Sequence, residues 1–87
     1  MILVITTKHF GSDKRIYRNE ILTFLALGLD VDYLFFNGSK DDLSLHRDYK
    51  DKITLLQGNY NDSFIKKFLF IANICCQRKY QYIHIHD

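Results

Sequence analysis

An apolar segment, a polar loop, an amphipathic segment and a second apolar segment follow one another between Ile2 and Val31. Residues 2–7 are rich in apolar and β-branched side chains, which is typical of a strand covered on both faces in a parallel sheet. Ser12 or Asp13 can cap the helix that follows, and Gly28 can end that helix in the left-handed conformation. A strand, a helix and a strand in this order predict the opening unit of an α/β domain.

The rest of the chain repeats this alternation. Further strands are predicted at 30–36, 52–56 and 81–86, and a second helix from Ser63 to about Lys79, capped by Asp62 or Asn61. The wide apolar stripe of this helix predicts deep burial between the sheet and another element. The charged residues 39–50 predict a loop or a short irregular helix. Right-handed crossovers then require a doubly wound α/β fold with parallel strands, numbered along the chain, in the order 3-2-1-4 and the two main helices on opposite faces.

Size and charge limit the classes of function. Eighty-seven residues make at most one small domain. Twelve basic residues against ten acidic ones give a net charge of +2, and the basic residues are scattered, so nucleic acid is not expected as a partner. Adjacent Cys75 and Cys76 are expected to be two buried thiols in a reducing compartment. No basic leader precedes the first apolar run, and no apolar run approaches the about 20 residues that cross a bilayer, which favours a cytoplasmic protein.

The topology also predicts where a ligand would bind. Between strands one and four the connections leave in opposite directions and open a crevice at the carboxyl ends, lined by residues 7–13 and 84–87. The first helix directs its N-terminus there, so Gly11, Ser12 and the cap at Asp13 are candidates to hold a phosphate or a sugar hydroxyl. Arg15 lies in the first turn and can reach the same crevice, whereas Glu20 lies more than a turn further along. A solvated or salt-bridged helix face remains the alternative for both side chains.

A metal site is an alternative use of the same strand ends. His84 and His86 share one face of the fourth strand, and together with Asp87 and His9 they could form a metal site, although a strand histidine is more often hydrogen-bonded structure. His86 and Asp87, at the strand exit, are the better candidates to contact a ligand, and no metal site is predicted. No G-x-G-x-x-G motif and no P-loop lysine-serine pair follow the first strand, which argues against a dinucleotide binder or an NTPase.

Three spaced motifs carry a resemblance to a known family. They read T-x-x-H-x-x-x-D-x-R-I-x-x-x-E, then L-x-x-G-x-x-V, and finally H-x-H-D at the fourth strand. In order and spacing the chain resembles the N-terminal half-domain of family 4 glycosyltransferases of the GT-B fold. The resemblance implies two Rossmann-like domains facing a cleft, and retaining transfer of a sugar from a nucleotide-sugar donor to a glycan or glycolipid acceptor. It implies no metal ion and no other cofactor.

The resemblance also implies roles for parts of this chain. The N-terminal domain of such enzymes mainly binds the acceptor, and its first loop approaches the donor diphosphate. Carried over by position, the cleft residues are Thr7, His9, Gly11, Asp13 and Arg15, with His86 and Asp87 at the neighbouring strand end. Residues 1–87 would then be an incomplete acceptor-side domain without its donor-binding partner domain. We expect such a chain to be inactive alone and prone to self-association through its open sheet edge.

Other readings remain open. A free-standing flavodoxin-like binding or regulatory module has the same order of elements, and so does a fragment of a nucleotide-sugar epimerase. Lys66 and Lys67 keep a further alternative open, in which the second helix lies on a membrane surface.

Overall fold

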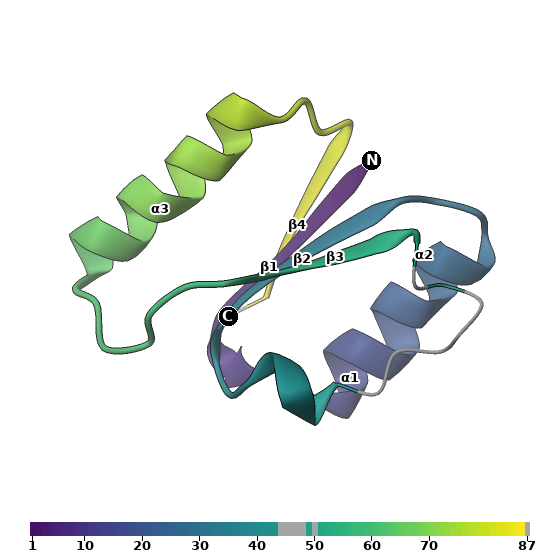
Figure 1. The fold of residues 1–87 in the computed structure, drawn as a ribbon, viewed down its shortest axis with the longest axis horizontal. Helices are drawn as coiled ribbons and strands as arrows, with labels where there is room; N and C mark the ends of the chain where they lie inside the picture. Colours follow the sequence, from purple (N-terminus) through teal and green to yellow (C-terminus); the bar gives the residue numbers. More distant parts are fainter. Residues whose placement is uncertain (44–48, 50, 87) are drawn as a thin grey trace.

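The structure is a computed structural model that describes residues 1–43, 49 and 51–86 (Figure 1). Four strands form its sheet: β1 Ile2–Phe10, β2 Val31–Asn37, β3 Ile53–Gln57 and β4 Tyr82–His86. They lie in the order β3-β2-β1-β4, and each neighbouring pair is parallel. The predicted α/β class, strand order and parallel direction are confirmed, and the arrangement is that of a partial Rossmann-like domain.

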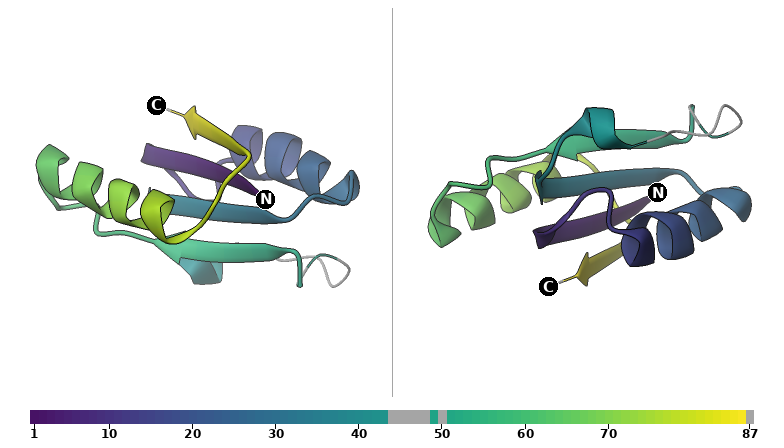
Figure 2. Two further views of the ribbon diagram at one scale, coloured as in Figure 1. Left: turned by 90° about the horizontal axis from the view of Figure 1, so that it is seen from above. Right: turned by 90° about the horizontal axis from the view of Figure 1, so that it is seen from below.

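Helices cover both faces of this sheet, as predicted (Figure 2). On one face, α1 Lys14–Ile16, the π-helical turn η1 Tyr17–Ile21 and α2 Leu22–Ala26 follow one another without a break. The other face carries α3 Phe64–Gln77. A short 3-10 helix, η2 Lys40–Asp42, lies in the connection between β2 and β3, where a loop or short irregular helix was predicted. Residues 44–48 and 50 of that connection lie outside the described residues.

The buried strand β2 shows how the sequence builds two apolar layers. Val31, Tyr33 and Phe35 point to one side, where they pack with residues of the first helical segment. Leu34 and Phe36 point to the other side, towards α3. Because side chains alternate along a strand, one apolar run supplies both layers, and the sidedness predicted from the sequence is confirmed.

The helix α3 differs from prediction in its burial. None of its residues is buried, and the exposed fractions of Phe64 and Phe68 are 83% and 61%. Only one side of the helix contacts the sheet, through partly buried residues such as Ile71 and Ile74. The prediction of deep burial on all of its apolar side was therefore wrong for the described residues, because nothing among them packs on the outer part of the stripe. Cys75 is half-buried and Cys76 is exposed, so the expectation of two buried thiols was also wrong.

The start of α3 also differs from prediction. Ser63 caps the helix, and its hydroxyl accepts a hydrogen bond of 3.3 Å from the backbone N–H of Lys66. Asn61 and Asp62 were the predicted caps, but their backbone N–H groups donate to Asn59 in a turn that precedes the helix. Asn61 and Asp62 thus belong to the preceding turn, and Ser63 stands directly before the first helical residue, Phe64, where a cap must lie.

The end of the first helical segment follows prediction. Gly28 adopts a positive φ of 84°, and its N–H donates to the carbonyl of Leu25. This left-handed conformation suits glycine and terminates the helix before β2.

Among the described residues, no helix combines the length and the apolar character that crossing a bilayer requires.

Candidate functional site

The turn from β1 into the first helix is organised by Asp13. Its carbonyl accepts from the N–H groups of Ile16 and Tyr17, and its Oδ1 accepts from the N–H of Arg15 at 2.9 Å. The guanidinium of Arg15 donates to the same carboxylate, at 3.3 Å from Nη2 to Oδ2. This side-chain contact is the main cause that lowers the pKa of Asp13, and the same contact raises the pKa of Arg15. Of the two predicted caps, Asp13 is the one used, and Ser12 lies exposed beside it.

His84 and His86 stand on the face of β4 that looks towards the first helical segment. Their register partners on β1 are Val4 and Thr6. The two imidazoles stack with ring centroids 4.5 Å apart and an interplanar angle of 24°. Parallel pairing to β1 therefore fixes two ring nitrogen donors side by side, as the H-x-H spacing predicts.

Glu20 reaches this histidine pair from the helix. Its Oε2 is hydrogen-bonded to Nε2 of His86 and lies 3.7 Å from Nε2 of His84. Glu20 belongs to the π-helical turn, in which the N–H of Leu22 donates to the carbonyl of Tyr17, five residues earlier. One ligand atom from each of Glu20, His84 and His86 lies within 4.8 Å of the others.

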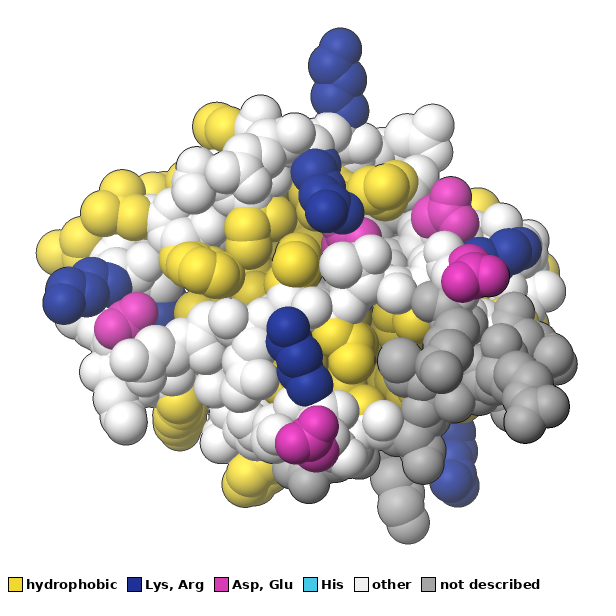
Figure 3. Space-filling view, viewed as in Figure 1, with side chains coloured by type: hydrophobic (Ala, Val, Ile, Leu, Met, Phe, Trp, Pro, Cys, Tyr) yellow, Lys and Arg dark blue, Asp and Glu magenta, His cyan; other side chains and the backbone are white. Residues whose placement is uncertain are grey.

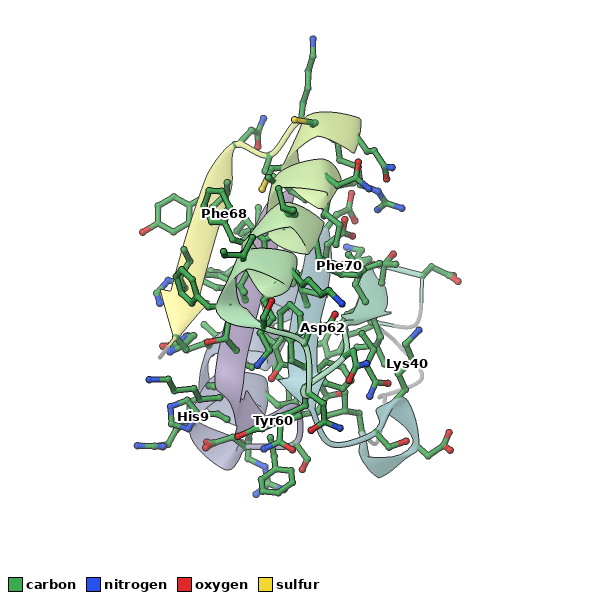
Figure 4. The ribbon with its side chains drawn as sticks, turned by 90° about the vertical axis from the view of Figure 1, so that its left-hand side faces the viewer. His9, Lys40, Tyr60, Asp62, Phe68 and Phe70 are labelled. Carbon is green, nitrogen blue, oxygen red and sulfur yellow. The ribbon has the colours of Figure 1, made fainter. Side chains whose placement is uncertain are left out.

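A pocket of about 350 Å³ lies beside this cluster, at the carboxyl ends of β1 and β4. It is lined by His9, Arg15, Ile16, Glu20 and His86. The lining combines a guanidinium, a carboxylate and two imidazoles with one apolar wall. Figure 4 shows His9 at the same end of the molecule as the tip of the β4 arrow. The pocket lies at the predicted crevice, where the connections of the sheet leave in opposite directions.

Thr7 does not join this pocket. It lines a second pocket of about 410 Å³ on the opposite face of the sheet, between β1, β4 and α3, lined by Thr7, Lys8, Phe64, Lys67, Phe68, Ile71 and Ile85. Successive residues of a strand point to opposite faces, so Thr7 lies opposite Thr6. His9 nevertheless lies on the Thr6 side, because the pairing of β1 with β2 is irregular between Thr6 and Phe10. The N–H of His9 donates to the hydroxyl of Thr6 at 3.2 Å. The structure therefore separates Thr7 from the other predicted cleft residues.

Gly11 is buried below the pocket and has a packing role. Its N–H donates to the carbonyl of Asn37 at 3.0 Å, and its carbonyl accepts from the hydroxyl of Tyr33 at 2.7 Å. A Cβ atom at this position would lie 2.7 Å from the ring of Phe35. The amide that was predicted to face an anion is engaged inside the protein, and the close approach that requires glycine is to an aromatic ring.

Sequence reasoning underrated two residues of the site. Glu20 was placed too far along the helix to reach the crevice, and His84 was ranked below His86. The signal available for His84 was its spacing of two from His86, which places both rings on one face. For Glu20 the available signals were its place at the end of the first motif and its spacing of four from Ile16, which lines the same pocket. Asp87, the remaining predicted residue, lies outside the described residues.

The opposite face of the sheet carries an apolar surface. We use this name for the exposed side chains of Phe64, Phe68, Leu69 and Ile85, which belong to α3 and β4. Figure 3 shows hydrophobic side chains gathered on the α3 side of that view, and Figure 4 shows Phe68 on the β4 side of the helix, with Phe70 on the other side. Exposed apolar area of this kind is typical of an interaction surface.

Comparison with protein-family models, with curated protein sequences and with solved structures finds no match to this chain.

Proposed function

We propose that this chain is the acceptor-side part of a retaining, metal-independent glycosyltransferase, and that the pocket at the ends of β1 and β4 holds a sugar of a glycan or glycolipid acceptor. The observation that carries the proposal is the convergence of His9, Arg15, Glu20 and His86 on one pocket at the switch point of a sheet ordered β3-β2-β1-β4. All four side chains also belong to the sequence motifs that resemble family 4 glycosyltransferases, His9, Arg15 and Glu20 to the first motif and His86 to the last.

The chemistry of the lining suits a sugar. Each hydroxyl of a sugar donates one hydrogen bond and accepts others, so a pocket for it needs both kinds of partner. Glu20 supplies acceptors, Arg15 supplies donors, and the imidazoles of His9 and His86 supply either one. A volume of about 350 Å³ falls at the lower end of small-molecule sites, which suits one monosaccharide unit.

The proposal gives this chain binding and not catalysis. Donor recognition and the reacting groups are assigned to a second domain outside these residues. We therefore expect acceptor-type sugars to bind weakly here. A nucleotide sugar should bind no more tightly than the sugar without its nucleotide.

The test is an NMR titration of the isotope-labelled chain with methyl glycosides of common hexoses and with UDP-glucose, in the presence of EDTA. We expect at least one glycoside at millimolar concentration to shift the amide signals of residues 9–20 and 84–86. Glu20→Gln should weaken that binding, because it replaces an acceptor oxygen with a donor. Thr7→Val, on the other face of the sheet, should leave it unchanged. The proposal is overturned if no glycoside shifts those signals, or if Thr7→Val and Glu20→Gln have equal effects.

A further inference from the structure

We propose that Glu20, His84 and His86 form a binding site for a divalent transition-metal ion, with zinc as the ion that the donor set fits best. This inference goes beyond the proposed function, which uses no metal; it shares Glu20 and His86 with the proposed sugar pocket but does not depend on sugar binding.

The three donor atoms lie close enough together to share one ion. Zinc lies about 2.0 to 2.2 Å from nitrogen and oxygen ligands, which places tetrahedral ligand atoms about 3.3 Å apart. Nε2 of His84 already lies 3.7 Å from Oε2 of Glu20, and the three ligand atoms all lie within 4.8 Å of one another. Small side-chain rotations would therefore be enough to surround an ion, and the backbone could remain in place.

The fold positions all three side chains before an ion arrives. Pairing of β4 with β1 directs both imidazoles to one face, and their rings are already stacked. Glu20 is directed at them by the π-helical turn, a feature that occurs frequently at functional sites. Between 21% and 33% of each side chain is exposed, so the donors are partly desolvated and still open to an ion that enters through the pocket.

The identity of the donors selects the kind of ion. Two imidazoles and one carboxylate suit zinc and its neighbours among the transition metals, whereas magnesium and calcium prefer oxygen ligands alone. Binding needs the lone pair on Nε2 of His86, so the metal-bound imidazole would be neutral, with its ring proton on Nδ1. The adjoining pocket leaves space for water as a fourth ligand, an open position that zinc sites with three protein ligands commonly have.

The charge around the cluster is compatible with a cation. Glu20, the sole glutamate of the chain, contributes a negative charge at the centre of the cluster. Arg15 is the cation in the pocket lining, and it is paired with Asp13 at 3.3 Å. The repulsion that this guanidinium would exert on a bound ion is therefore offset by its own carboxylate partner.

The test is a titration with Co²⁺, whose visible spectrum reports coordination, followed by competition with Zn²⁺. It is done at pH 7.5 in the Cys75→Ser/Cys76→Ser background, because these adjacent thiols are competing soft ligands. We expect one equivalent of Co²⁺ to give the intense absorption of a tetrahedral site, and Zn²⁺ to abolish it. Glu20→Gln, His84→Gln and His86→Gln should each weaken binding by at least about tenfold.

The matched control is Asp30→Asn, which removes an exposed carboxylate at the other end of the sheet and should change affinity less than twofold. A second readout is zinc-dependent protection of the unsubstituted chain against thermal unfolding, which a bound ion must produce by mass action. The inference is overturned if no tetrahedral Co²⁺ spectrum appears, or if the three variants bind like the background protein. Sugar binding measured in EDTA is independent of both results, so failure of this site and failure of the proposed function are distinguishable.

Discussion

Arg78 donates a hydrogen bond of 2.6 Å from Nη1 to Oδ2 of Asp32, forty-six residues earlier in the chain. The hydroxyl of Tyr80 donates to the same oxygen, also at 2.6 Å. Asp32 is only 2% exposed, on the side of β2 that faces α3. The two partners lie in the segment that joins α3 to β4, so one carboxylate ties this crossover to the sheet.

Asp32→Ala should lower the free energy of unfolding by about 2 kcal/mol, because hydrogen bonds to charged groups contribute about 1.5 to 3 kcal/mol and Arg78 is partly exposed and can be rehydrated. Urea unfolding followed by circular dichroism measures the change. Asp41→Ala, at an exposed position in η2, is the control and should have almost no effect. Equal losses in the two variants would show that the carboxylate at position 32 does not anchor the crossover.

Gly11→Ala should destabilise the protein by about 1 to 3 kcal/mol, because the new methyl group would lie 2.7 Å from the ring of Phe35 in a packed core. Phe35→Leu removes the clashing ring, so the alanine should cost less in that background than in the natural chain. A double-mutant cycle by urea unfolding measures this coupling. Ser12→Ala, at the exposed neighbouring position, is the control. Additive effects of the two core substitutions would contradict the packing role of Gly11.

Stability should fall as the pH rises above about 10, the ordinary pKa of tyrosine. Burial is the main cause that raises the pKa of Tyr33 well above this value, and burial also raises the pKa of Tyr17 and Tyr80. The unfolded chain then releases its phenolic protons before the folded one does, so this stabilisation is complete below about pH 10 and is lost at higher pH. Tyr33→Phe should reduce the slope of unfolding free energy against pH between about pH 9.5 and 11. An unchanged slope would rule out Tyr33 as a source of this dependence.

The apolar surface should make the chain self-associate at micromolar concentration, because exposed phenylalanine and isoleucine side chains lie beside the edge strand β4. Phe68→Lys and Ile85→Lys should each shift the population towards monomer in sedimentation velocity runs. Leu27→Lys is the control, since Leu27 is 72% exposed but lies at the end of α2 on the other face of the sheet. A monomeric natural chain, or an equal shift with the control, would contradict this use of the surface.

Most of the fold could be predicted from the sequence, because the apolar patterns of the strands and the glycine at the helix end are those that the observed topology requires. The apolar run of β1 and the alternation of β2 indicated a sheet covered on both faces, and Gly28 marked the end of the first helix. The errors concern α3. Its apolar stripe predicts that something covers it but cannot say what does, and Ser63 is the cap because the helix begins at Phe64, one residue later than a cap at Asp62 would require.

The site was readable only in part, because two backbone irregularities decide which side chains meet. Alternation alone places Thr7 on the far face, and this could have been foreseen, but the irregular pairing that returns His9 to the Thr6 side has no sequence signature. Spacing of four places Glu20 on the same helix face as Ile16, which lines the pocket, but its contact with His86 is made from the π-helical turn. The residues that meet at a strand end can be predicted by topology, whereas the exact partner of His86 depends on local winding.

The direction of the Glu20 side chain depends on the one extra residue that the π-helical turn contains relative to an α-helical turn. Deleting Asn19 would remove this extra residue and rewind the turn as an α-helix, so Glu20 would no longer keep its present angle to the histidines. The histidines would keep their positions on β4, which is paired with β1, but Glu20 would no longer face them. A deletion of one residue, far from β4 in the chain, would thus break up the cluster although Glu20, His84 and His86 were all still present in the sequence.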